Sequence, residues 1–317
     1  MLEIIQPAFM TSLQDAGRYG YQRYGVPPSG PMDWLSHKAA NLLVGNSENA
    51  ACLELGITDA IFQFHCDAII ALTGAGYELK INSRSLTSWT SLFVRKGSEI
   101  EVLKVRGGNW AYLAVNGGFN VPYVLGSQSS FLRANLGLAI TSGSMIDLCS
   151  SNSDFPKLSG RQLPVSMRPA FQETNKIKLM HGLHDHCFTA EALQVLCQST
   201  YSVSLSSDRM GLRLLGTKLD HAKGADVVSH GMVLGSVQVP ADGQPIVMMP
   251  DHPTTGGYTQ IAVVTKASMP YLVQSEPGLK IFQFTLQSVE EAQQEYLSMY
   301  NDIYKGLSAQ EEDWLFL

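Results

Sequence analysis

The sequence predicts a mostly β protein with few helices. Short runs of β-forming residues dominate it, bounded by Gly, Asn, Asp and Pro, as strands separated by turns are. Clear examples are Ala68–Leu72, Glu99–Leu103 and Ile261–Val264. Hydrophobic residues make up 45% of the 317 residues and charged residues 16%, so the chain can bury a large core. This length suggests one large domain or two of ordinary size, and we expect two.

A few helices interrupt the predicted strands. Asp33 can cap a helix that runs through Leu43 and stops at a glycine, and Thr189 can cap a second. The clearest helix is the last one, because Ser288-x-x-Glu291 forms a capping box and apolar residues then recur at helical spacing. We therefore expect a long C-terminal helix.

A polar stretch near the middle of the chain separates the two expected domains. Residues 151–174 are rich in Ser and Pro and follow neither hydrophobic period, which is typical of a connection. The predicted lobes are residues 1–150 and 175–317. Val26–Pro31 resembles Val239–Gln244, which would fit a duplication. Equally, Val-Pro-x-x-Gly is common chemistry for a hairpin turn, so both interpretations stay open.

Charge and cysteine patterns exclude several classes of protein. The net charge is −6 and no segment gathers Lys and Arg, so we do not expect nucleic acid as a partner. No run of about 18 apolar residues and no basic start followed by an apolar run is present, so we expect neither a membrane span nor secretion. The five cysteines include no C-x-x-C pair, which argues against disulfides or zinc and favours the cytoplasm.

The common catalytic motifs are missing from this chain. We find no phosphate-binding G-x-x-x-x-G-K-[ST] loop, no H-E-x-x-H and no G-x-S-x-G, so we expect no turnover by the chain alone. His181, His184 and His186, with Asp185 and Cys187, could suggest a metal site. We favour a polar loop and no metal, because neighbouring residues on an extended segment point to opposite faces.

Three polar segments could instead form a binding site. Each crowds Gly, Arg, Asp, Ser or Thr into a loop, which brings backbone N–H groups and fixed charges close to an anionic or polar ligand. The segments are Thr11–Arg18 continued by Ser29–Asp33, then Ser207–Arg213, and finally Asp251–Tyr258. The alternative is a set of tight turns whose Asp and Arg side chains bind backbone groups or one another.

These segments also carry a resemblance to a known family. The ordered matches are Ser12–Arg18, Gly25–Asp33, Ala40–Asn46, Leu53–Glu54, Tyr112–Gly118, Val124–Ser127, Ser207–Gly211, Gln238–Pro240 and Thr254–Tyr258. On these residues the chain resembles the family variously described as the C subunit of 5-oxoprolinase, allophanate hydrolase subunit 2 or biotin-dependent carboxyltransferase family protein. The resemblance covers nearly the whole chain.

The resemblance implies a fold and a set of partners. It implies two cyclophilin-like β-barrel lobes in tandem, a few short helices and a C-terminal helix. It also implies a second cyclophilin-like subunit, similar to the B subunit of 5-oxoprolinase, together with a third, hydrolase subunit that is similar to the A subunit. Together such subunits hydrolyse 5-oxoproline to glutamate with ATP, and which of them binds ATP stays open.

Two other functions are compatible with the resemblance. One is a biotin-dependent carboxyltransferase subunit of the urea carboxylase or allophanate hydrolase type, although this chain has no Met-Lys-Met segment to which biotin is attached. The other is a non-catalytic regulatory binding protein that antagonises a kinase inhibitor, as one relative is described to do. We favour the ATP-hydrolysing 5-oxoprolinase, because a free-standing chain fits a small complex of several subunits.

The expected site follows from the chemistry of that reaction. The substrate and an acyl-phosphate intermediate are anionic, which suits guanidinium forks together with hydroxyl and backbone donors. Carboxylates near the arginines would orient them or act as general bases. The predicted catalytic residues are Asp33, Asp251 and Tyr258. The predicted substrate-binding residues are Arg18, Ser29, Arg209, Arg213, Gln238, Thr254 and Thr255.

Four positions depart from the usual pattern of the family. Gln128 and Ser130 stand where Arg and Thr are usual, Leu183 replaces Pro, and Pro253 replaces Gln. The first lobe has therefore lost basic character. At the other end of the chain, the apolar residues Trp314–Leu317 would need cover, which we expect from a partner protein or a second copy of the chain.

Overall fold

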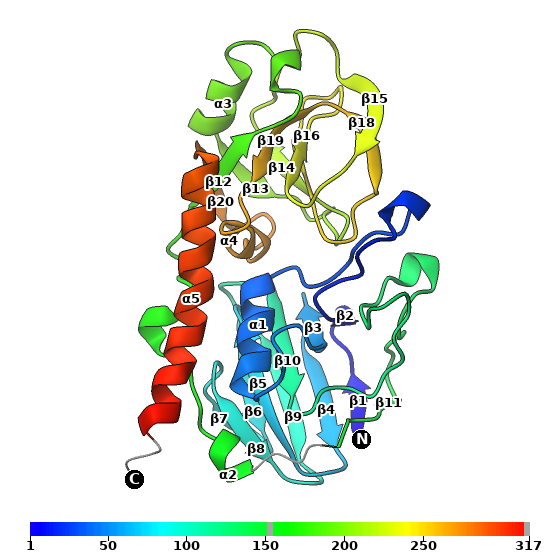
Figure 1. Cartoon of the computed structure of the whole chain (residues 1–317), viewed down its shortest axis with the longest axis vertical. Coiled ribbons are helices and arrows are strands. Elements are labelled where there is room, and N and C mark those ends of the chain that lie inside the picture. Colours follow the sequence, from blue (N-terminus) through cyan, green and yellow to red (C-terminus); the bar gives the residue numbers. More distant parts are fainter. Residues whose placement is uncertain (151–154, 314–317) are drawn as a thin grey trace. The chain divides into compact units, whose positions relative to one another are not determined.

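The computed structural model describes residues 1–150 and 155–313 (Figure 1). The predicted apolar end of the chain, from residue 314, lies outside them. The chain folds into two compact units. Unit 1 consists of Met1–Arg18, Asp33–Pro169 and the chain from Tyr300 onward, and unit 2 consists of Tyr19–Met32 and Ala170–Met299. These units differ from lobes cut along the sequence, because residues 19–32 belong to unit 2 and the chain from Tyr300 belongs to unit 1.

Unit 1 contains two antiparallel sheets, and the expectation of a mostly β protein is confirmed. The first sheet has the strand order β11 (Ser144–Ile146), β1 (Leu2–Gln6), β4 (Ala60–Phe64), β9 (Glu99–Lys104), β6 (Tyr77–Ile81) and β7 (Arg84–Leu86). The second has the order β2 (Met10–Gln14), β3 (Cys52–Gly56), β10 (Trp110–Val115), β5 (Ala68–Gly74) and β8 (Ser91–Val94).

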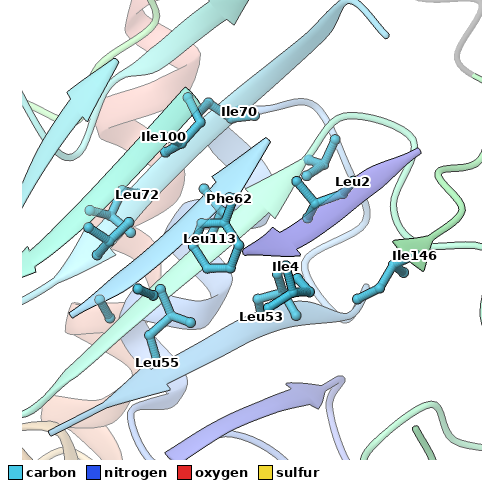
Figure 2. Close-up of a cluster of buried hydrophobic side chains, with 14 of the residues drawn as sticks. Leu2, Ile4, Leu53, Leu55, Phe62, Ile70, Leu72, Ile100, Leu113 and Ile146 are labelled. Atoms are coloured by element: carbon cyan, nitrogen blue, oxygen red, sulfur yellow. The ribbon is translucent and has the colours of Figure 1, made fainter. Parts of the chain in front are cut away.

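The core of unit 1 draws its side chains from both sheets. Figure 2 shows Leu2 and Phe62 of the first sheet gathered with Leu53 and Leu113 of the second, and all four are 0% exposed. Alternate residues of these strands point the same way, which is how a period of two builds one apolar face. Each such side chain contributes about 1.5–3 kcal/mol when it is fully buried.

The helix α1 (Trp34–Leu43) covers the other face of the second sheet, packing on β5, β10 and β3. It begins at Asp33 as predicted, because this carboxylate accepts the N–H groups of Leu35 and Ser36. Strand β3 is consequently buried along its whole length, including Glu54.

Unit 2 is built on a closed seven-stranded barrel. Its strand order is β12 (Lys176–His181), β19 (Gln260–Val264), β16 (Ser236–Gln238), β17 (Ile246–Met248), β14 (Gly211–Gly216), β13 (Thr200–Val203) and β20 (Ile281–Leu286). The parallel pairing of β20 with β12 closes the barrel, so its strands leave no open edge. A separate two-stranded antiparallel sheet consists of β15 (Asp226–Gly231) and β18 (Thr255–Tyr258).

The remaining helices are few, as expected. They are α2 (Phe155–Leu158), α3 (Ala192–Gln198), α4 (Met269–Val273) and α5 (Val289–Asp313), with short 3-10 turns at Gln22–Tyr24, Leu132–Ala134, Val165–Met167 and Asp185–Cys187.

The capping box of α5 is confirmed, since Ser288 and Glu291 exchange bonds between side chain and backbone at 2.9 and 3.2 Å. Thr189 was the wrong cap for α3. That helix has Glu191 at its N-cap, and the N–H of Thr189 bonds the carbonyl of Asp220 instead.

Residues 155–169 of the predicted connection pack as part of unit 1, and residues 170–174 belong to unit 2. Leu163 is 0% exposed, and its N–H donates to the carbonyl of Trp89. Thr90 and Gln162 form an isolated β-bridge beside it. Residues 155–169 therefore have buried and hydrogen-bonded partners, which local composition could not indicate.

Candidate functional site

A paired arginine and aspartate form the centre of the polar cluster in unit 2. The Asp208 carboxylate first shapes a tight turn by accepting the N–H groups of Met210 at 2.8 Å and Gly211 at 3.2 Å. Arg209 then reaches Asp251, with its Nε 2.8 Å from Oδ2 and its Nη2 3.1 Å from Oδ1. These bonds show that Asp208 binds backbone groups of its own turn and that Arg209 reaches a residue 42 positions further along the chain.

The guanidinium group of Arg209 also binds the segment Tyr19–Met32, which belongs to unit 2. Nη2 of Arg209 donates to the carbonyl of Gly30 at 2.8 Å. Beside it, the N–H of Ser29 donates to the carbonyl of Pro250 at 3.1 Å. Predicted residues Ser29, Arg209 and Asp251 are therefore brought together, although 180 residues or more separate the first from the others in sequence.

Ser29 is held in an unfavourable backbone conformation. Its φ is 56°, in the left-handed region that costs an L-residue roughly 1–2 kcal/mol. Its Oγ is buried and bonds no described residue. Strain of this kind persists only where the surroundings fix the chain, which the Arg209 and Pro250 contacts do.

The Arg209–Asp251 pair is largely shielded from water. The side chains are 12% and 9% exposed. Both carboxylate oxygens bind the guanidinium, so the two charges neutralise one another in a planar, two-bond geometry. In this arrangement Asp251 orients Arg209, and its carboxylate is occupied rather than open to take a proton from a substrate. The predicted catalytic role of Asp251 stays a prediction.

The third polar segment continues from Asp251 with neutral groups. His252 is 3% exposed, and burial lowers the pKa of its imidazole below the usual value, so it is neutral at pH 7. Thr255 and Tyr258 are exposed on β18, and Thr254 is half-buried just before it. Their hydroxyls are in position to meet a ligand or another protein.

Gln238 connects β18 to the barrel. This side chain is 6% exposed, and its Nε2 lies 3.3 Å from Sδ of Met232 and 3.4 Å from the carbonyl of Tyr258. A Cβ at Gly256 would come within 2.7 Å of the same amide nitrogen, so a larger residue there would require the Gln238 side chain to shift. Arg213, in contrast, exposes its side chain on β14, and its N–H donates to Oγ of Ser207 at 3.0 Å.

The predicted residues of unit 1 have buried structural partners. Asp33 is 0% exposed, and besides capping α1 it accepts the Ser36 hydroxyl at 2.6 Å. The N–H of Asp33 donates to the Tyr112 hydroxyl, which donates in turn to Glu54 at 2.7 Å. Burial, followed by the charges of Glu54 and Asp33, raises the pKa of Tyr112 well above its usual value, so this phenol stays protonated.

Arg18 is also closed off from solvent. It is 1% exposed, with Nε bonded to the carbonyl of Val124 and Nη2 to that of Ser129, both at 2.8 Å. The roles of Arg18 and Asp33 in substrate chemistry therefore stay predictions, and the bonds they make are those of a backbone clamp and a helix cap.

The sequence analysis missed a further buried carboxylate, that of Asp15. Its Oδ1 accepts the hydroxyls of Ser127 and Ser129, both at 2.6 Å, and its Oδ2 accepts the N–H of Gln128 at 2.7 Å. Burial alone would raise the pKa of Asp15, but these bonds and one from Gly17 lower it below its ordinary value. The sequence signals that could have indicated this pairing are the Asp15-x-Gly17 turn and the serine-rich segment Ser127–Ser130.

The histidines of the segment His181–Cys187 interact with other residues of unit 2. Nδ1 of His181 lies 2.9 Å from Asp185, and the rings of His184 and His230 are 4.7 Å apart. Across the described ranges, no group of three or more His, Cys, Asp or Glu is arranged to hold a metal ion. No helix in those ranges has the length and apolar character to cross a membrane.

Comparisons with known proteins connect this geometry to one family. Residues 24–285 match the family model described as "Carboxyltransferase domain, subdomain A and B". The chain is 35% identical to the C subunit of 5-oxoprolinase from Escherichia coli (strain K12) over 297 residues, covering 92% of this chain and 93% of that protein. It is 31% identical to the urea amidolyase of Saccharomyces cerevisiae, covering 87% of this chain but 16% of that protein.

Solved structures agree with the sequence comparison. The crystal structure of the Kluyveromyces lactis urea carboxylase superposes with a TM-score of 0.88 at 30% identity, covering 96% of this chain and 29% of that one. The K. lactis urea amidolyase gives a TM-score of 0.85 at 31% identity, covering 96% and 20%. This chain thus spans less than a third of either structure.

Proposed function

This chain belongs to the family of carboxyltransferase domains with subdomains A and B, and from that premise we propose that it is the C-type subunit of a 5-oxoprolinase. In this proposal a complex of several subunits opens the cyclic amide of 5-oxoproline to give glutamate, with hydrolysis of ATP. The chain acts within the complex and has no turnover of its own.

The length of the match is the observation that carries this proposal. The two relatives named as C subunits of 5-oxoprolinase match this chain over nearly all of their own length, 93% and 96%. The yeast urea amidolyase matches over 16% of its length. Because this chain matches nearly the whole of those two subunits, we expect it to work as a subunit of the same kind.

The bonding of the arginines supports a role that depends on partners. Arg18 binds two backbone carbonyls, and Arg209 is neutralised by Asp251. Arg18 is 1% exposed and the charge of Arg209 is paired with Asp251, so neither guanidinium is accessible to a triphosphate in this arrangement. We therefore assign ATP binding to another chain of the complex and give this one a positioning role, with Thr254, Thr255 and Tyr258 facing outward.

Reconstitution with separate products tests the proposal. The chain would be purified alone and with B-like and A-like subunits, and glutamate and phosphate release would be measured with 5-oxoproline and ATP. We expect glutamate only from the full set. Turnover by the chain alone, or by the partners without it, would contradict the assignment.

A second candidate is transfer of a carboxyl group from biotin that another protein carries. The observation in its favour is the close superposition on the urea carboxylase of K. lactis. Labelled bicarbonate, ATP and urea with a biotin-bearing partner separate the two candidates, since carboxyl transfer consumes label and 5-oxoproline hydrolysis does not. Binding to a partner without formation of either product would instead indicate a regulatory protein. For all three candidate functions we propose that the protein is located in the cytoplasm.

A further inference from the structure

Two histidines of unit 2 pack against each other, and the proposed function uses neither. The ring centroids of His184 and His230 are 4.7 Å apart, and the rings are tilted by 44°. His184 follows β12 and is fixed to β19, because its N–H donates to the carbonyl of Gln260 at 3.0 Å. His230 belongs to β15, which lies beside β18 (Figure 1). The ring contact therefore joins the barrel to the two-stranded sheet of β15 and β18.

Hydrogen bonding fixes the position of the proton on His230. Its Nδ1 lies 3.0 Å from the carbonyl of Gly231, and a carbonyl only accepts, so Nδ1 carries the hydrogen of the neutral ring. The lone pair is then on Nε2, which is buried and bonds no described residue. Protonation would create a buried N–H group at Nε2 without an acceptor, which is unfavourable.

The proton on His184 is fixed from the opposite side of the ring. The backbone N–H of Gln260 donates to Nδ1 of His184 at 3.4 Å, so the hydrogen of the neutral ring is on Nε2. Protonation would place a second hydrogen opposite the N–H of Gln260 and break this bond. In both rings, the nitrogen that must take a proton has surroundings that suit only the neutral form.

The charges near the two rings favour the neutral form as well. Oδ2 of Asp185 is 2.9 Å from Nδ1 of His181, and Oδ1 is 3.8 Å from Nδ1 of His186, so this carboxylate is bonded to other histidines. Burial, followed by the charges of His230 and His186, lowers the pKa of His184. The elements that pack here also contribute Lys223 before β15, Asp226 on β15, Tyr258 on β18 and the uncharged Gln260 on β19.

The β15–β18 sheet depends on contacts of this kind because it has little packing of its own. A sheet of two strands is marginally stable in isolation. Most residues of β15 are exposed, Val228 to 91%, and the pairing with β18 is irregular between Asp226 and His230. Losing one contact can therefore open this sheet while the barrel stays folded.

We propose that His184 and His230 form a pH switch, in which the neutral pair holds the β15–β18 sheet on the barrel and protonation of either ring releases it. Release leaves Thr255 and Tyr258 of β18 without a fixed position. The inference goes beyond the proposed function, because it concerns a conformational change of this chain alone and needs no substrate or partner.

The direction of the pH dependence follows from the proton positions. The released form accepts a proton more readily than the packed form, so the packed form is most stable above the ordinary histidine pKa of 6.5. Its stability falls as the pH drops below that value. Histidine is the side chain whose ordinary pKa lies between about pH 5 and 8, so the switch acts in that range.

Amide hydrogen exchange of the full chain, followed by mass spectrometry, tests the switch. Protection of residues 226–231 and 255–258 would be compared at about pH 7.5 and about pH 5, after correction for the pH dependence of intrinsic exchange. We expect protection of these residues to fall severalfold at the lower pH and that of β14 to stay unchanged. Unchanged protection of β15 and β18 would overturn the proposal. An equal loss in β14 would also overturn it, because it would indicate general unfolding by acid.

Substitution by asparagine removes the proton sites with the least change in bonding. An asparagine amide can accept from the N–H of Gln260 or donate to the carbonyl of Gly231, and it takes no proton in this range. The double variant His184→Asn/His230→Asn should protect β15 and β18 equally at both pH values. His186→Asn, a change of an exposed histidine in the same segment, is the control and should keep the pH dependence. A double variant that still responds to pH would contradict the proposal.

The histidine ring resonances provide a measurement that needs no substitution. In an NMR titration of the original chain, His184 should titrate below pH 6.5, and the loss of protection in β15 should have the same midpoint. Different midpoints would refute the switch even where the double variant does not fold. None of these measurements uses 5-oxoproline, ATP or a partner subunit. Failure of the reconstituted complex to release glutamate would therefore count against the proposed function and leave the switch unaffected.

Discussion

At the scale of single residues, the largely buried charged groups Arg209, Arg18 and Asp15 each have hydrogen-bond partners within the protein. Arg209 pairs with Asp251, Arg18 donates to backbone carbonyls, and Asp15 accepts from hydroxyl and N–H donors. Buried charges are tolerated because each has such partners, and losing one partner is costly. The first two predictions follow from this bonding.

We expect Arg209→Ala to lower the free energy of unfolding by about 3 kcal/mol, because it leaves the buried Asp251 carboxylate without its partner. Urea titration measures this directly. The double variant Arg209→Ala/Asp251→Ala is the control, and it should be more stable than the single variant because both charges are gone. A change below about 0.5 kcal/mol, typical of a surface substitution, would show that the pair contributes little.

The stability provided by Asp15 should depend on pH. Its pKa in the folded chain lies below the ordinary value of 3.8, so the stabilisation is present above that value and is lost as pH falls through the folded pKa. Asp15→Asn should therefore destabilise the protein at pH 7, and the difference from the original chain should shrink below about pH 4. Urea titrations at both pH values check this; a difference independent of pH would refute it.

Residue patterns could predict some of these contacts and not others. The cap formed by Asp33 is local, so it could be predicted from the sequence around it. The partner of Arg209 lies 42 residues away, and that of Asp15 lies more than 110 residues away. Such pairs depend on how the strands are brought together, which no local pattern encodes.

At the scale of elements, a helix could be predicted correctly where its first residues carry a side-chain cap. The capping box of α5 and the cap of α1 involve side chains within three residues of the helix start. Helix α3 has no side-chain cap, so its start could not be recognised and Thr189 was wrongly chosen. The start of a helix can be recognised in the sequence only where a side chain supplies the hydrogen bond that the backbone lacks there.

The cap of α1 gives a test of the predicted role of Asp33. Asp33→Ala should cost about 1–2 kcal/mol of stability, whereas Asp33→Asn keeps an accepting oxygen for Leu35 and Ser36 and should cost less than about 1 kcal/mol. Unfolding transitions and turnover of the assembled complex would both be measured. If Asp33→Asn is stable but abolishes turnover, Asp33 has a catalytic role beyond the cap.

Helix α5 is fastened to unit 1 by a carboxylate. Glu48 accepts the hydroxyls of Tyr300, at 2.9 Å, and Tyr304, and pairs with Lys38 at 2.9 Å. Glu48→Ala should therefore raise amide hydrogen exchange in residues 300–307, as measured by mass spectrometry. Glu290→Ala, an exposed change in the first turn of the same helix, is the control. Unchanged exchange in the Glu48 variant would mean that apolar packing alone holds this part.

At the scale of the whole molecule, the order of segments along the chain differs from their grouping into the two compact units. The fold class and the C-terminal helix could be predicted, because strand periodicity and capping are written in local sequence. Segment 19–32 packs in unit 2 and the chain from Tyr300 in unit 1, an exchange that rests on contacts such as Ser29 with Pro250. The closed barrel of unit 2 and the two sheets of unit 1 likewise depend on long-range pairing.

The central claim is that this chain is one subunit of an enzyme that needs all its subunits. The most direct test measures glutamate released from 5-oxoproline and ATP by the B-like and A-like partners, with this chain added in increasing amounts. The account predicts no release without the chain, and a rise that saturates when it matches its partners in amount. Full activity of the partners without this chain would contradict it.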